Sequence, residues 1–234
     1  MIYILQNYWQ ALLYSDGYTM TGVAMTLWLL VISCFIGFII AVPLAIARNA
    51  RNPLVWFPVW LYTFIFRGTP LYVQLLIIYT GFYSLDFVRE TAPLNEFFRQ
   101  GINCTILAFG LNTGAYTTEI FAGAIKDTAF GEVDAARSLG MSQFKLYQRI
   151  ILPGALRRAL PVYSNEVILM LHATTLAFTA TVPDILKVAK DAYSATYNPF
   201  ASFSIAAVLY LCISFGLIFA FRKAEQHFLA FLKP

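Results

Sequence analysis

Long uncharged stretches alternate with short charged segments along this chain. Residues 17–47 contain no Asp, Glu, Lys or Arg, and neither do residues 192–221. Each stretch exceeds the roughly 20 apolar residues that a helix needs to cross a bilayer. Blocks with at most one charged residue, bounded by turn or charge signals, predict five transmembrane helices, near residues 19–47, 54–83, 101–125, 159–182 and 200–221. We therefore expect an all-α integral membrane protein with one transmembrane domain over residues 1–234.

The second expected span is too long for a single straight helix. Residues 54–83 would form a helix of about 45 Å, whereas a bilayer core needs about 30 Å. Arg67, Gly68 and Pro70 interrupt this span. Proline lacks an amide hydrogen and disfavours helix at the residue before it, so we expect a break near 67–70 with a shorter helix on either side. Broken backbone at membrane depth requires surrounding protein or water, which predicts that the break points inward and away from lipid.

Composition and charge agree with a membrane protein and suggest its orientation. Hydrophobic residues make up 59% of the chain and charged residues 12%, about half the charged fraction of a soluble domain. With the N-terminus outside and the C-terminus in the cytoplasm, eleven Lys and Arg lie in the cytoplasmic segments 48–53, 126–158 and 222–234, against four outside. Residues 1–16 contain no Lys or Arg and no cleavage-like small-residue site, so we expect no removable signal peptide. The net charge of +4 is spread among loops, so no nucleic-acid partner is expected.

A few ionisable residues fall within the expected spans. A full charge at mid-membrane costs at least about 2.5–3.5 kcal/mol, so such residues usually face a bundle interior or a pathway. Alternatively, Arg67 pairs with one of the two glutamates, Glu119 or Glu166, and only holds helices together. A lone histidine in a span, such as His172, is often a residue that forms a structural hydrogen bond. Together with the residues of the helix break, the candidates for a translocation path are Arg67, Gly68, Pro70, Glu119, Glu166 and His172.

Residues 126–158 form a polar segment that holds six of the sixteen Lys and Arg. Residues 134–149 can form a helix, with Asp134 near its positive end and Lys145 and Arg149 near its negative end, and we expect Pro153 to end it. Glycine within a helix costs about 1 kcal/mol relative to alanine, so Gly140 indicates either close packing or a chain reversal between two short helices. From its residues alone, the segment is predicted to be a solvated cytoplasmic loop with an ordinary amphipathic helix.

The spacing of this segment resembles the "EAA" loop of ABC importer permeases. In that family the loop is the coupling segment that docks on a cytoplasmic ATPase, which makes residues 126–158 the expected coupling loop. The residues that carry the resemblance are Asp134, Ala135, Ala136, Gly140, Ile150, Leu152 and Pro153.

The resemblance extends over nearly the whole chain. The stretches RGTPLYVQLLIIYTGFY (67–83), AYTTEIFAGAI (115–125) and NEVILMLHATTL (165–176) are similar to signatures of the polar amino acid ABC permeases. The resemblance implies a type I ABC importer permease fold and a multi-pass place in a bacterial inner membrane, with a periplasmic N-terminus and a cytoplasmic C-terminus. It also implies transport of polar, cationic L-amino acids such as histidine, arginine, lysine and ornithine.

The family resemblance also implies partners and leaves some residue roles open. The expected partners are a sister permease subunit, a dimer of cytoplasmic ABC ATPases and a periplasmic amino-acid-binding protein. ATP and magnesium would bind to the ATPase, and no cofactor to this chain. The chain departs from the family at Asp134, where Glu is usual, at Ala122, where Arg is common, and at His172, where Lys is common. The roles of those cations do not transfer, and a heterodimer in which the sister permease retains them would explain their absence.

Two other classes of function remain as alternatives. A secondary transporter or channel would use Glu119, Glu166 and His172 as a proton relay and would work without ATP. A membrane scaffold would use residues 126–158 only to anchor a cytosolic protein. The sequence has no phosphate-binding GxxxxGK[ST] loop, no HExxH or GxSxG motif and no paired-cysteine spacing. We therefore expect no catalytic residues, no enzymatic activity and no metal site on this chain.

Overall fold

Helices form nearly all of the structure in the computed structural model, which describes residues 1–229. The five longest are α2 (Gly22–Arg48), α3 (Pro53–Gly68), α7 (Gly101–Lys126), α10 (Leu152–Ala173) and α12 (Pro199–Phe228). The shorter ones, in chain order, are α1 (Ile2–Leu13), α4 (Leu71–Leu76), η1 (Ile77–Gly81), η2 (Phe82–Ser84), α5 (Asp86–Glu90), α6 (Ala92–Arg99), α8 (Phe130–Ser138), α9 (Gln143–Leu146), η3 (Tyr147–Ile151), η4 (Thr174–Ala180) and α11 (Ile185–Thr196).

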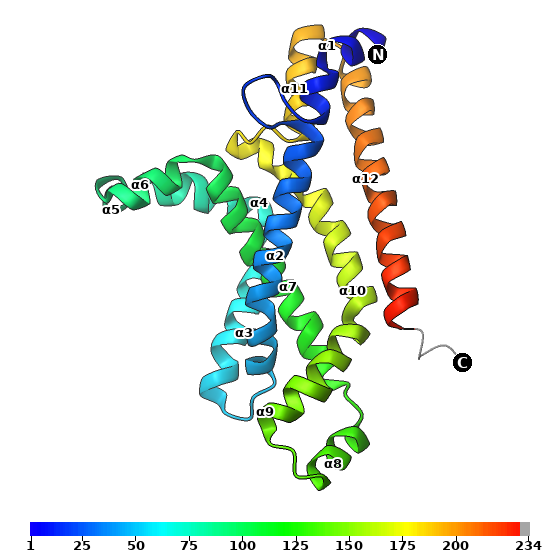
Figure 1. Ribbon diagram of the computed structural model, residues 1–234. Coiled ribbons are helices and arrows are strands. Elements are labelled where there is room, and N and C mark those ends of the chain that lie inside the picture. Colours follow the sequence, from blue (N-terminus) through cyan, green and yellow to red (C-terminus); the bar gives the residue numbers. More distant parts are fainter. Residues whose placement is uncertain (230–234) are drawn as a thin grey trace.

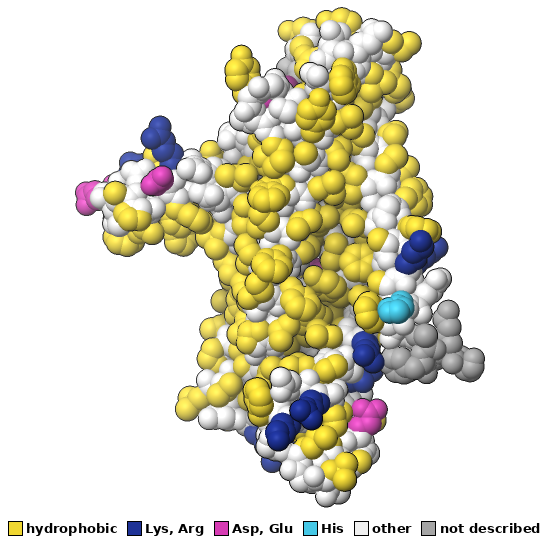
Figure 2. Space-filling view, in the orientation of Figure 1, with side chains coloured by type: hydrophobic (Ala, Val, Ile, Leu, Met, Phe, Trp, Pro, Cys, Tyr) yellow, Lys and Arg dark blue, Asp and Glu magenta, His cyan; other side chains and the backbone are white. Residues whose placement is uncertain are grey.

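The long helices run along the length of an elongated molecule (Figure 1). Helices α1 and α11 lie at one end, which we call the α1 end, and α8 and α9 lie at the other, the α8 end (Figure 1). Helices α5 and α6 form a side arm that projects from the body (Figure 1). On the face shown in Figure 2, hydrophobic side chains cover most of the surface between the two ends, whereas Lys and Arg gather on the side arm and toward the α8 end.

Helices α2 and α7 pack closely because small residues face each other where they meet. A Cβ atom on Gly37 would lie 2.5 Å from Cγ2 of Thr113 and 3.0 Å from the backbone nitrogen of Gly114. Such distances are far below van der Waals contact, so only glycine fits at residue 37. The resulting close approach of the two backbones is a common way to pack helices in a membrane, where apolar burial alone gives little driving force.

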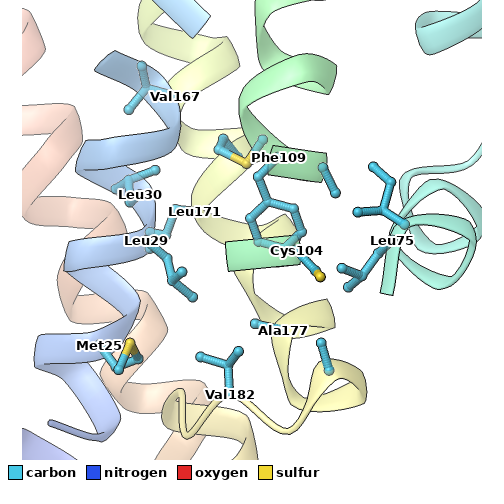
Figure 3. Packing of buried hydrophobic residues seen from close by; sticks show 14 residues of the cluster. Met25, Leu29, Leu30, Leu75, Cys104, Phe109, Val167, Leu171, Ala177 and Val182 are labelled. Carbon is cyan, nitrogen blue, oxygen red and sulfur yellow. The ribbon is translucent and has the colours of Figure 1, made fainter. Parts of the chain in front are cut away.

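The main hydrophobic core lies where α2, α4, α7, α10 and η4 meet (Figure 3). Leu29, Leu75, Cys104, Phe109 and Leu171 are fully buried there. A second cluster toward the α8 end joins residues of α2, α7 and α10 to the segment between α8 and η3. This second cluster fixes the polar segment to the body of the molecule.

The helix bounds agree with the sequence in some places and correct it in others. Helix α7 matches the stretch 101–125, and the expected break near 67–70 is present, with a bend of 103° between α3 and the segment Leu71–Ser84. Helix α10, however, begins at Leu152 and not near residue 159. Pro153 does not end a helix: helical residues run without a break from Gln143 through α9, η3 and α10, and Pro153 lies directly after the π-helical turn η3.

The far end of α10 also differs from the expected stretch 159–182. The α-helix stops at Ala173 and continues as the 3₁₀-helix η4. Hydroxyl groups of Thr174, Thr175 and Thr179 each donate to the carbonyl oxygen three residues earlier. Such local bonds compete with regular helix geometry and account for the change of helix type.

Not every long helix is apolar enough to be identified as a span from its composition. Among the described residues, α2 and α12 are long and apolar enough to cross a membrane, and α3 together with Leu71–Ser84 qualifies as a bent third candidate. Helix α7 buries several threonines and an asparagine, and α10 contains Arg157, Arg158 and Glu166. Lys233, one of the eleven basic residues assigned to the cytoplasm, lies outside the described residues.

Candidate functional site

Glu119 is paired, and its partner differs from the one considered in the sequence. Arg48 Nε donates to Glu119 Oε1 at 2.9 Å, and the Thr63 hydroxyl donates to the same oxygen at 2.7 Å. The pair joins the last turn of α2 to α7, while Thr63 adds α3. The alternative in which Arg67 pairs with one of the glutamates is not observed among the described residues, because Arg48 at the end of α2 pairs with Glu119 and Glu166 bonds to Thr113.

Arg67 lies beside this ion pair without bonding to it. Its guanidinium carbon is 5.3 Å from the ring centre of Tyr116, a cation–π arrangement, and its side chain is exposed. Arg67, Gly68 and Glu119 border one recess of about 290 Å³, whose lining residues are Arg48, Trp60, Thr63, Phe64, Arg67, Gly68 and Glu119. Two guanidinium groups and one carboxylate make this recess suitable for polar or charged groups.

The break at Pro70 is held by side-chain amides. The carbonyl oxygen of Phe66 accepts hydrogen bonds from Gln74 Nε2 at 2.8 Å and from Asn112 Nδ2 at 3.0 Å. Gln74 and Asn112 were not singled out in the sequence, although an isolated amide in an otherwise apolar span is a signal of an interhelical bond.

Glu166 and His172 lie apart from the recess. Glu166 is 7% exposed and accepts a hydrogen bond from the Thr113 hydroxyl at 3.2 Å, which links α10 to α7. His172 Nε2 lies 3.3 Å from the Ser214 hydroxyl of α12. Within the described chain, no hydrogen bond or ion pair connects Glu119, Glu166 and His172 to one another. The structure thus does not join the three residues into a chain of proton carriers.

The polar segment folds back on itself between two short helices. Helix α8 ends at Ser138, Gly140 has a φ of +75°, and α9 begins at Gln143 after Ser142, whose side chain caps the new helix. The expected alternative of a chain reversal at Gly140 is therefore the one observed. Glycine suits this position for its backbone angle, since a Cβ atom there would meet nothing within 4 Å.

The seven residues that resemble the coupling loop divide into buried and exposed groups. Ala136 is buried in the cluster near the α8 end, and Ile150 and Leu152 pack against that cluster. Ala135 and Gly140 are exposed, and Asp134 is half-buried at 3.9 Å from Arg137. Pro153 stays in the first turn of α10. The segment thus has an anchored side and a free side.

The free side also presents large hydrophobic residues that the sequence analysis missed. Phe130, Leu139 and Phe144 are 74%, 80% and 76% exposed. They belong to α8, the reversal and α9, which lie together at one end of the molecule (Figure 1). Exposed hydrophobic residues gathered in a polar segment are typical of a protein contact.

The segment is tied to α7 by a further residue that the sequence did not reveal. Arg158 Nη2 donates to the carbonyl oxygen of Ala124 at 3.1 Å and to the Thr128 hydroxyl at 2.8 Å. This bond fixes the start of α10 against the end of α7. A displacement of the polar segment would therefore act on both helices.

Comparison with known protein families identifies similar proteins over most of the chain. The family model described as "Binding-protein-dependent transport system inner membrane component" matches residues 33–227. The chain is 62% identical over 234 residues to the "Histidine/lysine/arginine/ornithine transport system permease protein HisM" of Escherichia coli (strain K12), covering 100% of this chain and 98% of that protein. It is 42% identical over 196 residues to the "Nopaline transport system permease protein NocM" of Agrobacterium fabrum, covering 84% of this chain and 81% of that one.

Solved structures share the same fold. One is described as the crystal structure of an amino acid ABC transporter with histidines; it has a TM-score of 0.75 and 27% identity, over 87% of this chain and 90% of that chain. An inward-facing structure of the MetNI methionine ABC transporter has a TM-score of 0.71 at 16% identity, over 87% of this chain and 93% of that one. The second likeness concerns the fold alone.

Proposed function

The chain belongs to the family of binding-protein-dependent transport system inner membrane components, and from this premise we propose that it is the permease subunit of an ATP-driven importer of histidine and cationic L-amino acids. The observation that carries the proposal is the 62% identity over the full chain to a permease whose name specifies histidine, lysine, arginine and ornithine. ATP hydrolysis belongs to a separate subunit, so this chain is a transport component and not an enzyme.

The proposed topology has five spans with a periplasmic N-terminus and a cytoplasmic C-terminus in a bacterial inner membrane. The spans are α2, the bent pair of α3 and α4, α7, α10 and α12. Helices α7 and α10 fit this proposal despite their polar residues, because neighbouring helices satisfy several of those groups. The excess of Lys and Arg toward the α8 end supports a cytoplasmic position for that end (Figure 2).

The segment from α8 to η3 is the proposed contact for the ATPase subunit. Leu139 and Phe144 provide exposed apolar surface, and the helix reversal at Gly140 presents them together. Ala136 and Arg158 fix the same segment to α7 and α10. A movement of the ATPase against the free side would therefore be passed to the membrane helices.

The recess at the helix break is the proposed part of the translocation path on this chain. Arg67 and Gly68 are exposed there, and Glu119 borders it while remaining paired with Arg48. Arg67 supplies a positive charge suited to the carboxylate that every free amino acid carries. Glu166 and His172 hold helices together in this proposal, since each has a hydrogen-bond partner on another helix.

A complete path requires further subunits. We propose a heterodimer with a sister permease, an ATPase dimer on the cytoplasmic side and a periplasmic amino-acid-binding protein. Ala122 and His172 occupy positions where many family members have Arg and Lys, respectively. This difference supports a pair of two different permeases, in which the sister subunit retains these basic residues. ATP and magnesium would be held by the ATPase, whose closure shifts the permease pair between inward-facing and outward-facing states.

The proposal is tested by uptake in cells that lack this chain. Radiolabelled histidine, arginine, lysine, glutamine and glutamate are supplied singly, with and without a plasmid that encodes the chain. We expect loss and plasmid-dependent recovery for histidine, arginine and lysine only. Unchanged uptake of all five amino acids would contradict the proposed substrates.

A further inference from the structure

The helix break deprives the carbonyl group of Phe66 of its normal partner. In an α-helix the amide hydrogen of residue 70 would bond to the carbonyl oxygen of residue 66, but Pro70 has no amide hydrogen. The helical hydrogen bonds of α3 continue only as far as Thr69, whose N–H group donates to the carbonyl oxygen of Ile65 at 3.1 Å. A backbone carbonyl group without a hydrogen-bond donor at membrane depth costs several kcal/mol, because it has lost its hydrogen bonds to water.

Two side-chain amides take the place of the missing donor. Gln74 Nε2 and Asn112 Nδ2 both point at the Phe66 oxygen, at 2.8 and 3.0 Å, which matches the two lone pairs of a carbonyl. The second hydrogen of Asn112 is used by Gln74 Oε1 at 3.1 Å. Gln74 Nε2 also lies 3.0 Å from the carbonyl oxygen of Thr69. Both amides are only 7% exposed, so water does not readily replace either one.

This hydrogen-bond network also fixes the position of Arg67, the residue after Phe66. Asn112 and Tyr116 are one turn apart on α7, and the Tyr116 hydroxyl lies 3.4 Å from the carbonyl oxygen of Arg67, as the donor. The Tyr116 ring also supports the Arg67 guanidinium. The carbonyl groups of two successive residues of α3, Phe66 and Arg67, thus bond to successive turns of α7. These bonds place the Arg67 side chain at the recess.

We propose that Gln74 and Asn112 are positioning residues, which hold the break open in the one geometry that places Arg67 at the recess beside Glu119. The role in transport rests on the proposed function, whereas the role of the two amides as substitutes for the Pro70 donor does not. Neither residue contacts the recess itself. Their effect on transport therefore passes through the backbone at Phe66 and Arg67.

The first variant is Gln74→Met, which keeps the length of the side chain and removes its donors. The melting temperature of the full chain, purified in detergent with its copurifying subunits, should fall by at least about 4–8 °C, because the hydrogen bonds of Gln74 to Phe66, Thr69 and Asn112 are all lost. The maximal rate of histidine uptake should fall at least about tenfold, because a binding group moves out of place. Uptake is divided by the amount of chain in the membrane. Gln6→Met, an exposed position in α1, is the matched control and should change neither quantity.

The decisive variant is Gln74→Met combined with Pro70→Ala. Alanine supplies the amide hydrogen that Phe66 lacks and allows α3 to continue, so the melting temperature should recover in part, because the bonds of Gln74 to Thr69 and Asn112 stay lost. Uptake should stay low, since a continuous helix removes the bend that places Arg67.

Three outcomes would overturn the proposal: a Gln74→Met chain with normal melting and uptake, a double variant that regains both, or a double variant that regains neither. Absence of uptake in wild type would instead reject the proposed function, while the melting temperatures would still decide the role of the amides.

Discussion

Glu119 illustrates how a single ionised residue is held among apolar helices. Its carboxylate receives one charged donor from Arg48 and one neutral donor from Thr63, so three helices meet at one oxygen atom. Desolvation of an ion pair roughly offsets its attraction, but removal of one partner leaves an uncompensated charge. The ion pair is therefore expected to add little to the net stability of the fold, whereas removal of one partner alone is expected to be harmful.

At this scale we predict that Glu119 and Arg48 are energetically coupled. Glu119→Gln should destabilise the chain by about 1–3 kcal/mol, because Arg48 keeps its charge without a carboxylate. Adding Arg48→Gln should recover part of the loss, as expected for residues in direct contact. The measurement is a double-mutant cycle of melting temperatures in detergent.

A different pattern would assign Glu119 to the substrate. If Glu119→Gln leaves the melting temperature unchanged and selectively weakens uptake of arginine and lysine, the carboxylate serves the path and the pairing role is wrong. Thr63→Val is a useful comparison, since it removes the neutral donor at 2.7 Å and leaves both charges in place.

At the scale of elements, the turn between α8 and α9 depends on the backbone of Gly140. Its φ of +75° is strained for other residues by about 1–3 kcal/mol, least for Asn and most for β-branched residues. Space is not limiting, because no atom lies within 4 Å of the added Cβ position.

Gly140→Val should therefore lower uptake strongly while the chain still inserts into the membrane, and Gly140→Asn should retain most of it. The informative quantity is the number of ATP molecules hydrolysed per amino acid imported, which should rise in Gly140→Val. Equal, normal ratios in both variants would show that the conformation of this turn does not matter for coupling.

Helix α11 offers an independent prediction about pH. Asp184 caps it by accepting from the backbone N–H groups of Leu186 and Lys187, and Tyr210 donates to the same side chain. Burial raises the pKa of Asp184 from 3.8 to about 6, against the lowering effect of these hydrogen bonds. The folded chain then holds this proton more tightly than the unfolded chain. Its contribution to the free energy of unfolding is greatest below about pH 4 and falls as pH rises toward 6.

Asp184→Asn keeps a good N-cap but cannot titrate. The melting temperature of wild type, relative to that of Asp184→Asn, should fall as pH rises from about 4 to about 6. Parallel curves for the two chains over this range would contradict the raised pKa.

The elements also show what could be read from the sequence. The stretch 101–125 and the break at 67–70 follow from local signals, namely a long stretch with Glu119 as its one charged residue and the chemistry of Pro70, and the structure has a helix and a bend there. The partner of Glu119 could not be predicted, because Arg48 reaches it only through the packing of α2 on α7. The start of α10 was misplaced, since Pro153 was expected to end a helix, whereas the helical run that begins at Gln143 continues through it.

At the scale of the whole molecule, the chain has the surface of a component that works in lipid and with partners. On the face shown in Figure 2, hydrophobic side chains cover the length of the molecule, and Lys and Arg lie on the side arm and toward the α8 end. The recess at Arg67 opens on the surface of this single chain. In the proposed function, a second permease encloses this recess.

We predict that this chain forms a functional pair only with a different permease subunit. Proteoliposomes that contain the chain and the ATPase but no sister subunit should show no histidine uptake, and addition of the sister should restore it. An active complex of two copies of this chain would contradict the heterodimer.

The central claim is that import through this chain is driven by ATP, and one measurement tests it directly. The complete complex is reconstituted into proteoliposomes, the binding protein and radiolabelled histidine are added outside, and ATP is enclosed or omitted. We predict uptake only with enclosed ATP, unaffected by a proton ionophore. Uptake without ATP that a proton gradient drives would contradict the account and favour a secondary transporter.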